Sequence, residues 1–217
     1  MIVTLTFDAA KSLFRLGRYA ELMEQCGLEP TSLRSLSQEH RVLLAQAAFH
    51  AGNIDGAVRI ARRENVAETS PEIRSKCEVI LGLVQRREAN WDSALRHFQL
   101  SVQFAKEAES VMQLGWSSVW LFRGLAEIQP TDALAAMLND TRKYVTRAGD
   151  PHLAAYMHDS IALMEASAGR IQEARRHLQI SSGLLERHPN AWLYQRLLLS
   201  RSFLDYLECR YEDALQP

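Results

Sequence analysis

Seven histidines and three cysteines are the side chains of this 217-residue chain best suited to metal or redox chemistry. Their spacing supports neither. His152 and His158 are six positions apart, so on one helix they point to different faces and form a poor metal pair. Cys26, Cys77 and Cys209 are odd in number and far apart, as expected for free thiols of a reducing compartment rather than a disulfide framework. We therefore predict no metal site and no cofactor.

Sequence motifs of the common catalytic classes do not occur in the chain. It contains no glycine-rich phosphate loop, no HExxH, no GxSxG and no dinucleotide-binding fingerprint. One enzymatic alternative stays open, in which Asp159 and His158 act together in a helical cavity. The main prediction is a protein that is not an enzyme.

Positive and negative charges are balanced along the chain. Its 25 basic and 26 acidic residues give a formal net charge of -1, so no overall attraction to nucleic acid or to an anionic membrane is expected. Arginine clusters such as Arg62-Arg63 and Arg86-Arg87 are interleaved with acidic residues, which indicates solvated helix faces. The alternative is a nucleic-acid-binding stripe, which requires these arginines to align along one surface.

The sequence shows no signal for export or membrane insertion. Residues 1–7 lack a basic leader and are too short for the apolar region of a signal peptide. No apolar run approaches the roughly 18 residues of a membrane-spanning helix. We therefore predict a cytoplasmic protein without a membrane partner.

A hinge pattern recurs six times along the chain. Each copy has a short polar turn, an aromatic or branched apolar residue and, three positions later, an Ala or Leu that begins an apolar stripe. Regular spacing in the range of about 20–50 residues is typical of stacked repeats. The fourth copy, Ile128–Ala133, is degenerate because it lacks a glycine and contains Pro130. The final residues of the copies are separated by 35, 37, 39, 41 and 40 positions: Leu22, Ala57, Ala94, Ala133, Ala174 and Ala214.

Capping residues and apolar periodicity predict helices between these hinges. Ser70-Pro71 and Asp150-Pro151 each place a capping oxygen before a proline suited to the first helical position, and Asn190 caps a further helix. Gly27 and Gly149 are placed to end helices in the left-handed conformation. The predicted helix pairs are 4–17 and 18–27, 37–51 and 53–64, 71–88 and 90–108, 111–128 and 130–148, 151–168 and 170–187, and 191–208 with 210 onward.

The hinges resemble those of the tetratricopeptide repeat. In the third unit Leu81-Gly82 stands where that family has its Leu-Gly pair, and Trp91, Ala94 and Phe98 follow at the expected offsets. The resemblance implies an all-α fold, a right-handed α-solenoid of about six helix-turn-helix repeats over residues 1–217, with units at about 4–27, 37–64, 71–108, 111–148, 151–187 and 191–217. Small residues such as Gly82 would let the paired helices approach closely. The longer intervals resemble the units of bacterial multidomain signal-transducing and transcriptional regulators.

The resemblance also implies where a partner would bind. In this family the first helices line a concave groove, where Arg86 and Arg87 are suited to clamp a carboxylate or an acidic peptide. Phe49 and Phe122 have an alternative role as packing between helices. The predicted partner contacts are Gln46, Phe49, His50, Lys76, Val79, Arg86, Arg87, Ser118, Phe122, Tyr156 and Asp159.

The function predicted from these observations is binding of a protein or peptide. The chain is expected to be a scaffold, sensor or regulatory module of a larger cytoplasmic bacterial protein, with a transcriptional regulator as one form. The alternative is a structural module that associates with itself through its C-terminal face, where Phe203, Tyr206 and Leu207 form an apolar surface. Because the helix from residue 210 stops after one turn, we expect the chain to be a fragment of a longer polypeptide, or else a partner to cover this end.

Overall fold

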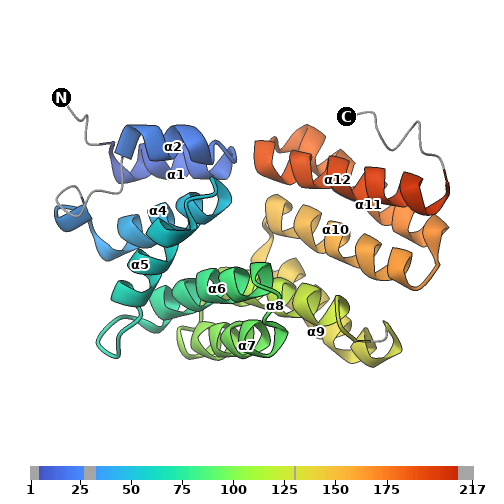
Figure 1. Cartoon of the computed structure of the whole chain (residues 1–217), viewed down its shortest axis with the longest axis horizontal. Helices are drawn as coiled ribbons and strands as arrows, with labels where there is room; N and C mark the ends of the chain where they lie inside the picture. The colour runs from blue at the N-terminus through green and yellow to red at the C-terminus, as the bar shows by residue number, and fades with distance from the viewer. Residues whose placement is uncertain (1–4, 27–32, 130, 210–217) are drawn as a thin grey trace. The chain divides into compact units, whose positions relative to one another are not determined.

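The computed structural model describes residues 5–26, 33–129 and 131–209, and the chain is all-helical over these ranges (Figure 1). The prediction of an all-α fold is confirmed, since none of the described residues lies in a β-strand. The described helices are α1 (Phe7–Arg15), α2 (Tyr19–Cys26), α4 (Gln38–His50), α5 (Ile54–Glu64), α6 (Pro71–Arg87), α7 (Trp91–Glu107), α8 (Val111–Ala126), the 3-10 helix η1 (Thr131–Leu134), α9 (Ala135–Ala148), α10 (Pro151–Ser167), α11 (Ile171–Arg187) and α12 (Ala191–Leu207).

The predicted helix starts follow from local capping. The side chains of Ser70, Asp150 and Asn190 each accept a hydrogen bond from the backbone N–H three residues later, at 3.5, 2.7 and 2.9 Å. Pro71 and Pro151 occupy the first turn of α6 and α10, where a missing N–H costs nothing. Gly149 ends α9 with φ 64°, as predicted, and Gly27 lies outside the described residues.

The fourth hinge differs from the prediction. A helix was expected from residue 130, whereas η1 occupies 131–134 and α9 begins only at Ala135. Its N-cap, Leu134, offers no side-chain oxygen to the free N–H groups of the first turn. The degenerate hinge therefore delays the helix.

The other hinges share one backbone feature. Their turn residues Gly17, Gly52, Ala89, Gly169 and Cys209 all have positive φ, at 71°, 89°, 57°, 75° and 57°. A left-handed residue at this place ends the first helix of a pair and starts the turn into the second. Equivalent turns therefore occur even where alanine or cysteine replaces glycine. The helix expected after Cys209 lies outside the described residues.

Two compact units make up the chain, Met1–Ser117 and Ser118–Pro217, with the division inside α8. In the first unit α4 pairs with α5 and α6 with α7, and α6 also packs on both α4 and α5. In the second unit α10 pairs with α11, and α12 packs on both. Each hairpin therefore buries its apolar face partly within the pair and partly against its neighbour in the same unit.

The α6–α7 and α10–α11 hairpins are equivalent in length and register. α6 spans residues 71–87 and α10 spans 151–167, and the partner helices span 91–107 and 171–187, an offset of 80 residues at every end. A buried contact repeats with the same offset. The hydroxyl of Ser101 donates to the carbonyl of Ser75 at 2.9 Å, and that of Ser181 donates to the carbonyl of Ala155 at 3.0 Å. One structural unit therefore occurs twice.

Close packing between α6 and α7 depends on Gly82. A Cβ atom at this position would lie 2.6 Å from Cε1 of Phe98 and 3.2 Å from the carbonyl oxygen of Ala94. Phe98 and Ala94 have no exposed surface. The close approach that the sequence predicted at Gly82 is confirmed.

Candidate functional site

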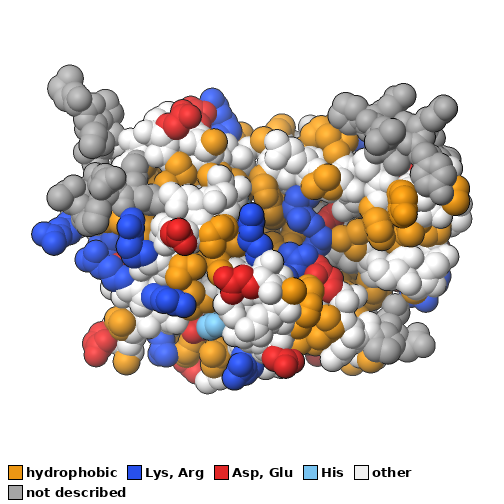
Figure 2. Space-filling model, in the orientation of Figure 1, with side chains coloured by type: hydrophobic (Ala, Val, Ile, Leu, Met, Phe, Trp, Pro, Cys, Tyr) orange, Lys and Arg blue, Asp and Glu red, His pale blue; other side chains and the backbone are white. Residues whose placement is uncertain are grey.

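Seven of the predicted partner contacts lie in the first unit, on the first helices α4 and α6. Arg87 is exposed, whereas Val79 is buried and has a packing role in place of the predicted surface contact. Figure 2 shows basic side chains interspersed with acidic ones over this unit. The half-buried contacts are Gln46, Phe49, His50, Lys76 and Arg86.

Two of these residues have partners inside the first unit. The ring of His50 stacks on Tyr19 with centroids 4.8 Å apart and meets the edge of Phe49 at 5.4 Å. The ammonium of Lys76 lies 2.6 Å from the carboxylate of Glu72, one turn earlier in α6. Part of the predicted face is therefore occupied by intramolecular contacts.

The four predicted contacts in the second unit are all buried: Ser118, Phe122, Tyr156 and Asp159. Phe122 and Tyr156 have no exposed surface, so neither can touch a partner directly. Tyr156 and Asp159 are buried because α9, α11 and α12 all pack against α10. These residues therefore have a structural role in place of the predicted surface contact.

A buried ion pair between Arg123 and Asp159 is the centre of polar chemistry in the second unit. Nη1 of Arg123 donates to Oδ2 of Asp159 at 2.8 Å and to the hydroxyl of Ser160 at 3.3 Å. The other carboxylate oxygen accepts from the hydroxyl of Ser200 at 2.5 Å. The side chains of Arg123 and Asp159 are only 5% and 4% exposed. Charges removed from water to this extent require such partners.

Aromatic rings surround this ion pair. Tyr156 packs against Trp120 and Trp192 with centroids 4.6 and 5.7 Å apart. The guanidinium carbons of Arg123 and Arg196 lie 5.4 and 5.7 Å from the centre of the same Tyr156 ring, within the range of cation–π attraction. Tyr156 therefore joins the apolar core to the buried charges.

The electrostatic surroundings keep Arg123 charged. Burial disfavours the cation, but Tyr156, Asp159 and Glu127 outweigh that effect and raise the pKa of Arg123. Its Nε has no hydrogen-bond partner among the residues that the structure describes, and the carboxylate of Glu127 lies 3.8 Å away. A buried donor without a partner costs about 1–3 kcal/mol. Arg123 is thus hydrogen-bonded on its Asp159 side and incompletely bonded at Nε.

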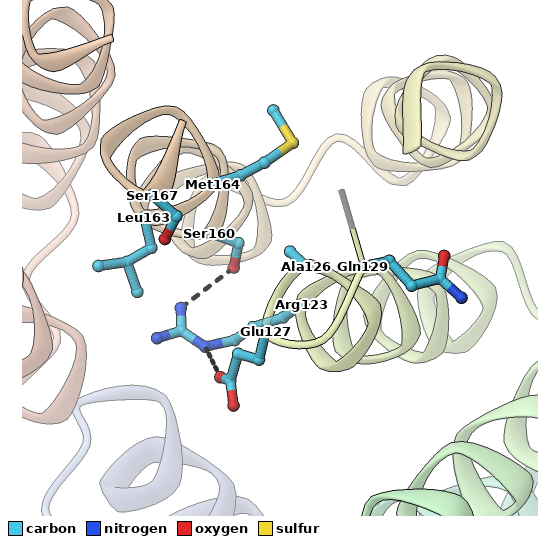
Figure 3. Close-up of a pocket in the computed structure, with 8 residues that line it drawn as sticks. All are labelled: Arg123, Ala126, Glu127, Gln129, Ser160, Leu163, Met164 and Ser167. Carbon is cyan, nitrogen blue, oxygen red and sulfur yellow. Dashed lines mark hydrogen bonds and ion pairs between the residues drawn. The ribbon is translucent and has the colours of Figure 1, made fainter. Parts of the chain in front are cut away.

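A pocket opens beside this incompletely bonded side (Figure 3). Its volume is about 310 Å³, and its lining comes from the end of α8, from the turn after it and from α10. Arg123 and Ser160 contribute polar atoms, Leu163 and Met164 contribute apolar surface, and the exposed Glu127 lies at the rim. Buried charge, apolar wall and solvent access occur here together.

A second cluster that the sequence did not predict joins two histidines of the α10–α11 hairpin. Nδ1 of His158 and Nδ1 of His177 lie 2.8 Å apart, and the rings stack with centroids 5.0 Å apart. Burial, followed by the charges of His177 and Arg142, lowers the pKa of His158 to about 4. Burial and then Arg142 also lower the pKa of His177. The two rings are therefore neutral at physiological pH and share one hydrogen bond.

The remaining candidates for chemistry are isolated. All three cysteines are free thiols, as predicted, and burial raises the pKa of Cys77 to about 12, which makes that thiol unreactive. Within residues 5–26, 33–129 and 131–209, no three His, Cys, Asp or Glu side chains are grouped so as to hold a metal ion. None of the helices in these ranges is both long and apolar enough to cross a membrane.

Comparison with known proteins defines a fold but not a family. No family model matches the chain, and no curated protein matches its sequence. Among solved structures, the chain is similar to the crystal structure of BtubC (BKLC) from P. vanneervenii, with a TM-score of 0.58 and 12% sequence identity. The match covers 94% of this chain and 85% of that one. At this identity the likeness concerns the fold alone.

Proposed function

We propose that the chain is a tetratricopeptide-like α-solenoid of about six hairpins that binds a protein or peptide, as a scaffold or regulatory module of a cytoplasmic protein. The exact offset of 80 residues between two hairpins and the recurring left-handed hinge support the repeat architecture. The fold-level likeness to BtubC over most of both chains is consistent with it.

One observation carries the binding function. The first helices α4 and α6 pack on each other, while the second helices α5 and α7 each pair with the first helix before them. This arrangement forms a row of first helices, and stacked repeat proteins use such rows as extended binding surfaces. Exposed and half-exposed side chains of the row include Gln46, Lys76, Arg86 and Arg87.

The arginines of this row favour an acidic partner. Arg86 and Arg87 lie in the last turn of α6, and Arg87 is exposed. A guanidinium binds a carboxylate with two parallel hydrogen bonds, so two neighbouring arginines suit a segment rich in Asp and Glu. We therefore infer that the row of first helices binds an acidic peptide segment.

A matched pair of double variants tests this function. Arg62 and Arg63 lie in the last turn of the second helix α5 and are exposed, so they provide the same charge at an equivalent helix end. Binding of fluorescein-labelled peptides rich in Asp and Glu is measured by anisotropy. Arg86→Glu/Arg87→Glu should weaken binding about tenfold or more, as expected for lost charge-assisted hydrogen bonds, whereas Arg62→Glu/Arg63→Glu should not. Equal affinity of the two variants would count against the proposed surface.

Self-association through α12 is a second candidate, favoured by its exposed apolar side chains. Leu199 is 68% and Tyr206 60% exposed, and Phe203 lies on the same stretch of helix. Apolar surface of this kind is typical of interaction sites. Sedimentation velocity over a range of concentrations tests it: a concentration-dependent dimer that Leu199→Asp/Tyr206→Asp abolishes supports self-association, and a monomer at every concentration excludes it.

A further inference from the structure

The pocket beside Arg123 has the size of a site for one small metabolite. Its volume is about 310 Å³, at the lower end of the range of about 300–1,000 Å³ for ligand pockets. One water molecule takes about 30 Å³ in the liquid, so the pocket accommodates a ligand of about ten non-hydrogen atoms. A single amino acid of medium size has this number of atoms.

Among the polar groups that line the pocket, which also include Gln129, Ser160 and Ser167, one charged donor and one charged acceptor lie side by side. Nε of Arg123 is buried and has no hydrogen-bond partner among the residues that the structure describes, so it offers a donor to a ligand oxygen. The carboxylate of Glu127, 3.8 Å away, offers an acceptor to a ligand N–H. Figure 3 shows the side chain of Arg123 extending from α8 and that of Glu127 from the turn after it, with Ser160 of α10 on the other side of the guanidinium.

The charge of the site selects against ligands with a net charge. Arg123 is paired with Asp159 at 2.8 Å, and Nη2 of Arg196 lies 3.8 Å from the same carboxylate. Together with Glu127, this makes two positive and two negative side chains. A ligand with a single charge would therefore bring an uncompensated charge into a partly buried site, whereas a zwitterion would not.

The apolar wall defines the rest of the ligand. Leu163 and Met164 of α10 and Ala126 of α8 line the pocket without offering a charge. An aliphatic or uncharged side chain fits against them, and removal of that surface from water contributes to affinity. The exposed Glu127 leaves the ammonium end of the ligand near solvent.

We propose that this pocket binds a free α-amino acid with an aliphatic or other uncharged side chain. The carboxylate of the ligand accepts from Nε of Arg123, its ammonium donates to Glu127, and its side chain packs on Leu163 and Met164. The site lies wholly in the second unit, and the proposal does not depend on the acidic-peptide surface of the first unit.

Isothermal titration calorimetry on the full chain tests the proposal with L-leucine, L-methionine and L-glutamine. At least one of the three should bind saturably with one site per chain. For the amino acid that binds, the matched acid without the ammonium and the matched amine without the carboxylate should bind at least about tenfold more weakly; for leucine these are isocaproate and isoamylamine. The N-acetyl derivative separates a free amino acid from the C-terminus of a peptide, because it retains the carboxylate but has a neutral amide in place of the ammonium. Failure of all three amino acids to bind, or equal binding of the N-acetyl derivative, would overturn the proposal.

Variants at the pocket keep the test independent of folding. Arg123 is unsuitable because its loss leaves Asp159 buried without its partner. Glu127→Gln removes the acceptor charge at the exposed rim, and Leu163→Trp fills the half-buried wall. Both should weaken amino-acid binding at least about tenfold while the ligand-free chain stays folded. Glu127→Gln also removes a charge that supports the buried Arg123, so a small fall in its melting temperature is expected. Glu173→Gln, at an exposed position on α11, is the matched control and should bind normally. Retained binding in Glu127→Gln would refute the assignment.

Discussion

His158 and His177 contact each other across the α10–α11 hairpin at the positions that correspond, 80 residues earlier, to Glu78 and His97. In the α6–α7 hairpin, Nδ1 of His97 lies 2.6 Å from a carboxylate oxygen of Glu78. The same pair of helix positions therefore holds an acid and a base in one hairpin and two bases in the other. In both hairpins the two polar side chains therefore contact each other across the pair of helices.

The histidine pair predicts a loss of stability in mild acid. The pKa of histidine in an unfolded chain is about 6.5, whereas the pKa of His158 in the folded chain is about 4. Between these values the unfolded chain binds more protons, so the contribution of the pair is complete above about pH 6.5 and is lost as the pH falls toward 4. Because the rings are partly exposed and screened by solvent, the effect should be on the order of 1 kcal/mol.

Urea unfolding at a series of pH values measures this effect. His158→Gln/His177→Gln should flatten the dependence of unfolding free energy on pH between about 6.5 and 4. The exposed His188→Gln should leave it unchanged. The charged neighbours Arg142, Glu165, Glu173 and Arg176 remain in both variants, so an unaltered dependence in the double variant would show that they, and not the pair, govern it.

Gly82→Ala should destabilise the α6–α7 hairpin. The added methyl group would lie 2.6 Å from a ring carbon of Phe98, and such overpacking costs about 1–3 kcal/mol, partly offset by the better helix propensity of alanine. At Gly183 in α11 the new Cβ meets no heavy atom within 4 Å apart from its chain neighbours and the backbone of its own helix, so Gly183→Ala should stabilise by up to about 1 kcal/mol. Thermal unfolding should therefore show a lower melting temperature for Gly82→Ala and a higher one for Gly183→Ala.

A compensating change checks the cause. The equivalent hairpin has Ala162 and Leu178 where α6–α7 has Gly82 and Phe98. Gly82→Ala/Phe98→Leu should therefore recover much of the stability lost in the single variant. If the double variant is less stable than Gly82→Ala by the full cost of Phe98→Leu, the steric explanation fails.

The hinges predict opposite effects of glycine and alanine exchange at equivalent positions. Ala89 has φ 57°, a conformation that costs an L-residue about 1–2 kcal/mol, and Gly169 has φ 75° at the same point of the other hairpin. Ala89→Gly should stabilise the chain, although the greater entropy of unfolded glycine reduces the gain to about 1 kcal/mol or less. Gly169→Ala should destabilise it by about 1 kcal/mol or more. If denaturant unfolding shows that both exchanges change the unfolding free energy in the same direction, the two turns are not equivalent.

Loss of one member of the buried ion pair should be costly. Asp159→Ala leaves the guanidinium of Arg123 buried without its main partner, a change worth about 3–5 kcal/mol. Arg123→Met/Asp159→Leu removes both charges and should recover most of that loss. The pair of Lys143 and Asp140 is a control, because both side chains are mostly exposed and Lys143→Ala should change the unfolding free energy far less than Asp159→Ala. The loss of unfolding free energy should therefore be large for Asp159→Ala and much smaller for both Arg123→Met/Asp159→Leu and Lys143→Ala.

The helices could be predicted from the sequence because their determinants are local. Ser70, Asp150 and Asn190 cap their own helices, and Gly82 reports a close approach between helices that are adjacent in the chain. The late start of α9 was not predicted, since the hinge before it lacks both the glycine and a capping side chain.

Burial of individual side chains was harder to predict than the helices. Tyr156 and Asp159 fit the expected offset for an exposed first helix, yet their exposure is decided by which other helices pack on α10. Arg123 lies in an apolar stretch, and its partner Asp159 is 36 residues further along the chain. A local sequence pattern could not predict a contact between residues so far apart. The histidine pair could have been predicted from the sequence, because His158 and His177 are 19 residues apart, as are Glu78 and His97 in the equivalent hairpin.

Hydrogen–deuterium exchange with a bound acidic peptide tests the central claim most directly, since it locates the binding surface on the chain. The proposal predicts added protection in the first helices α4 and α6, residues 38–50 and 71–87, and little change in α5 and α7. Protection confined to α5 and α7, or no protection in the presence of saturating peptide, would contradict a binding surface formed by the first helices.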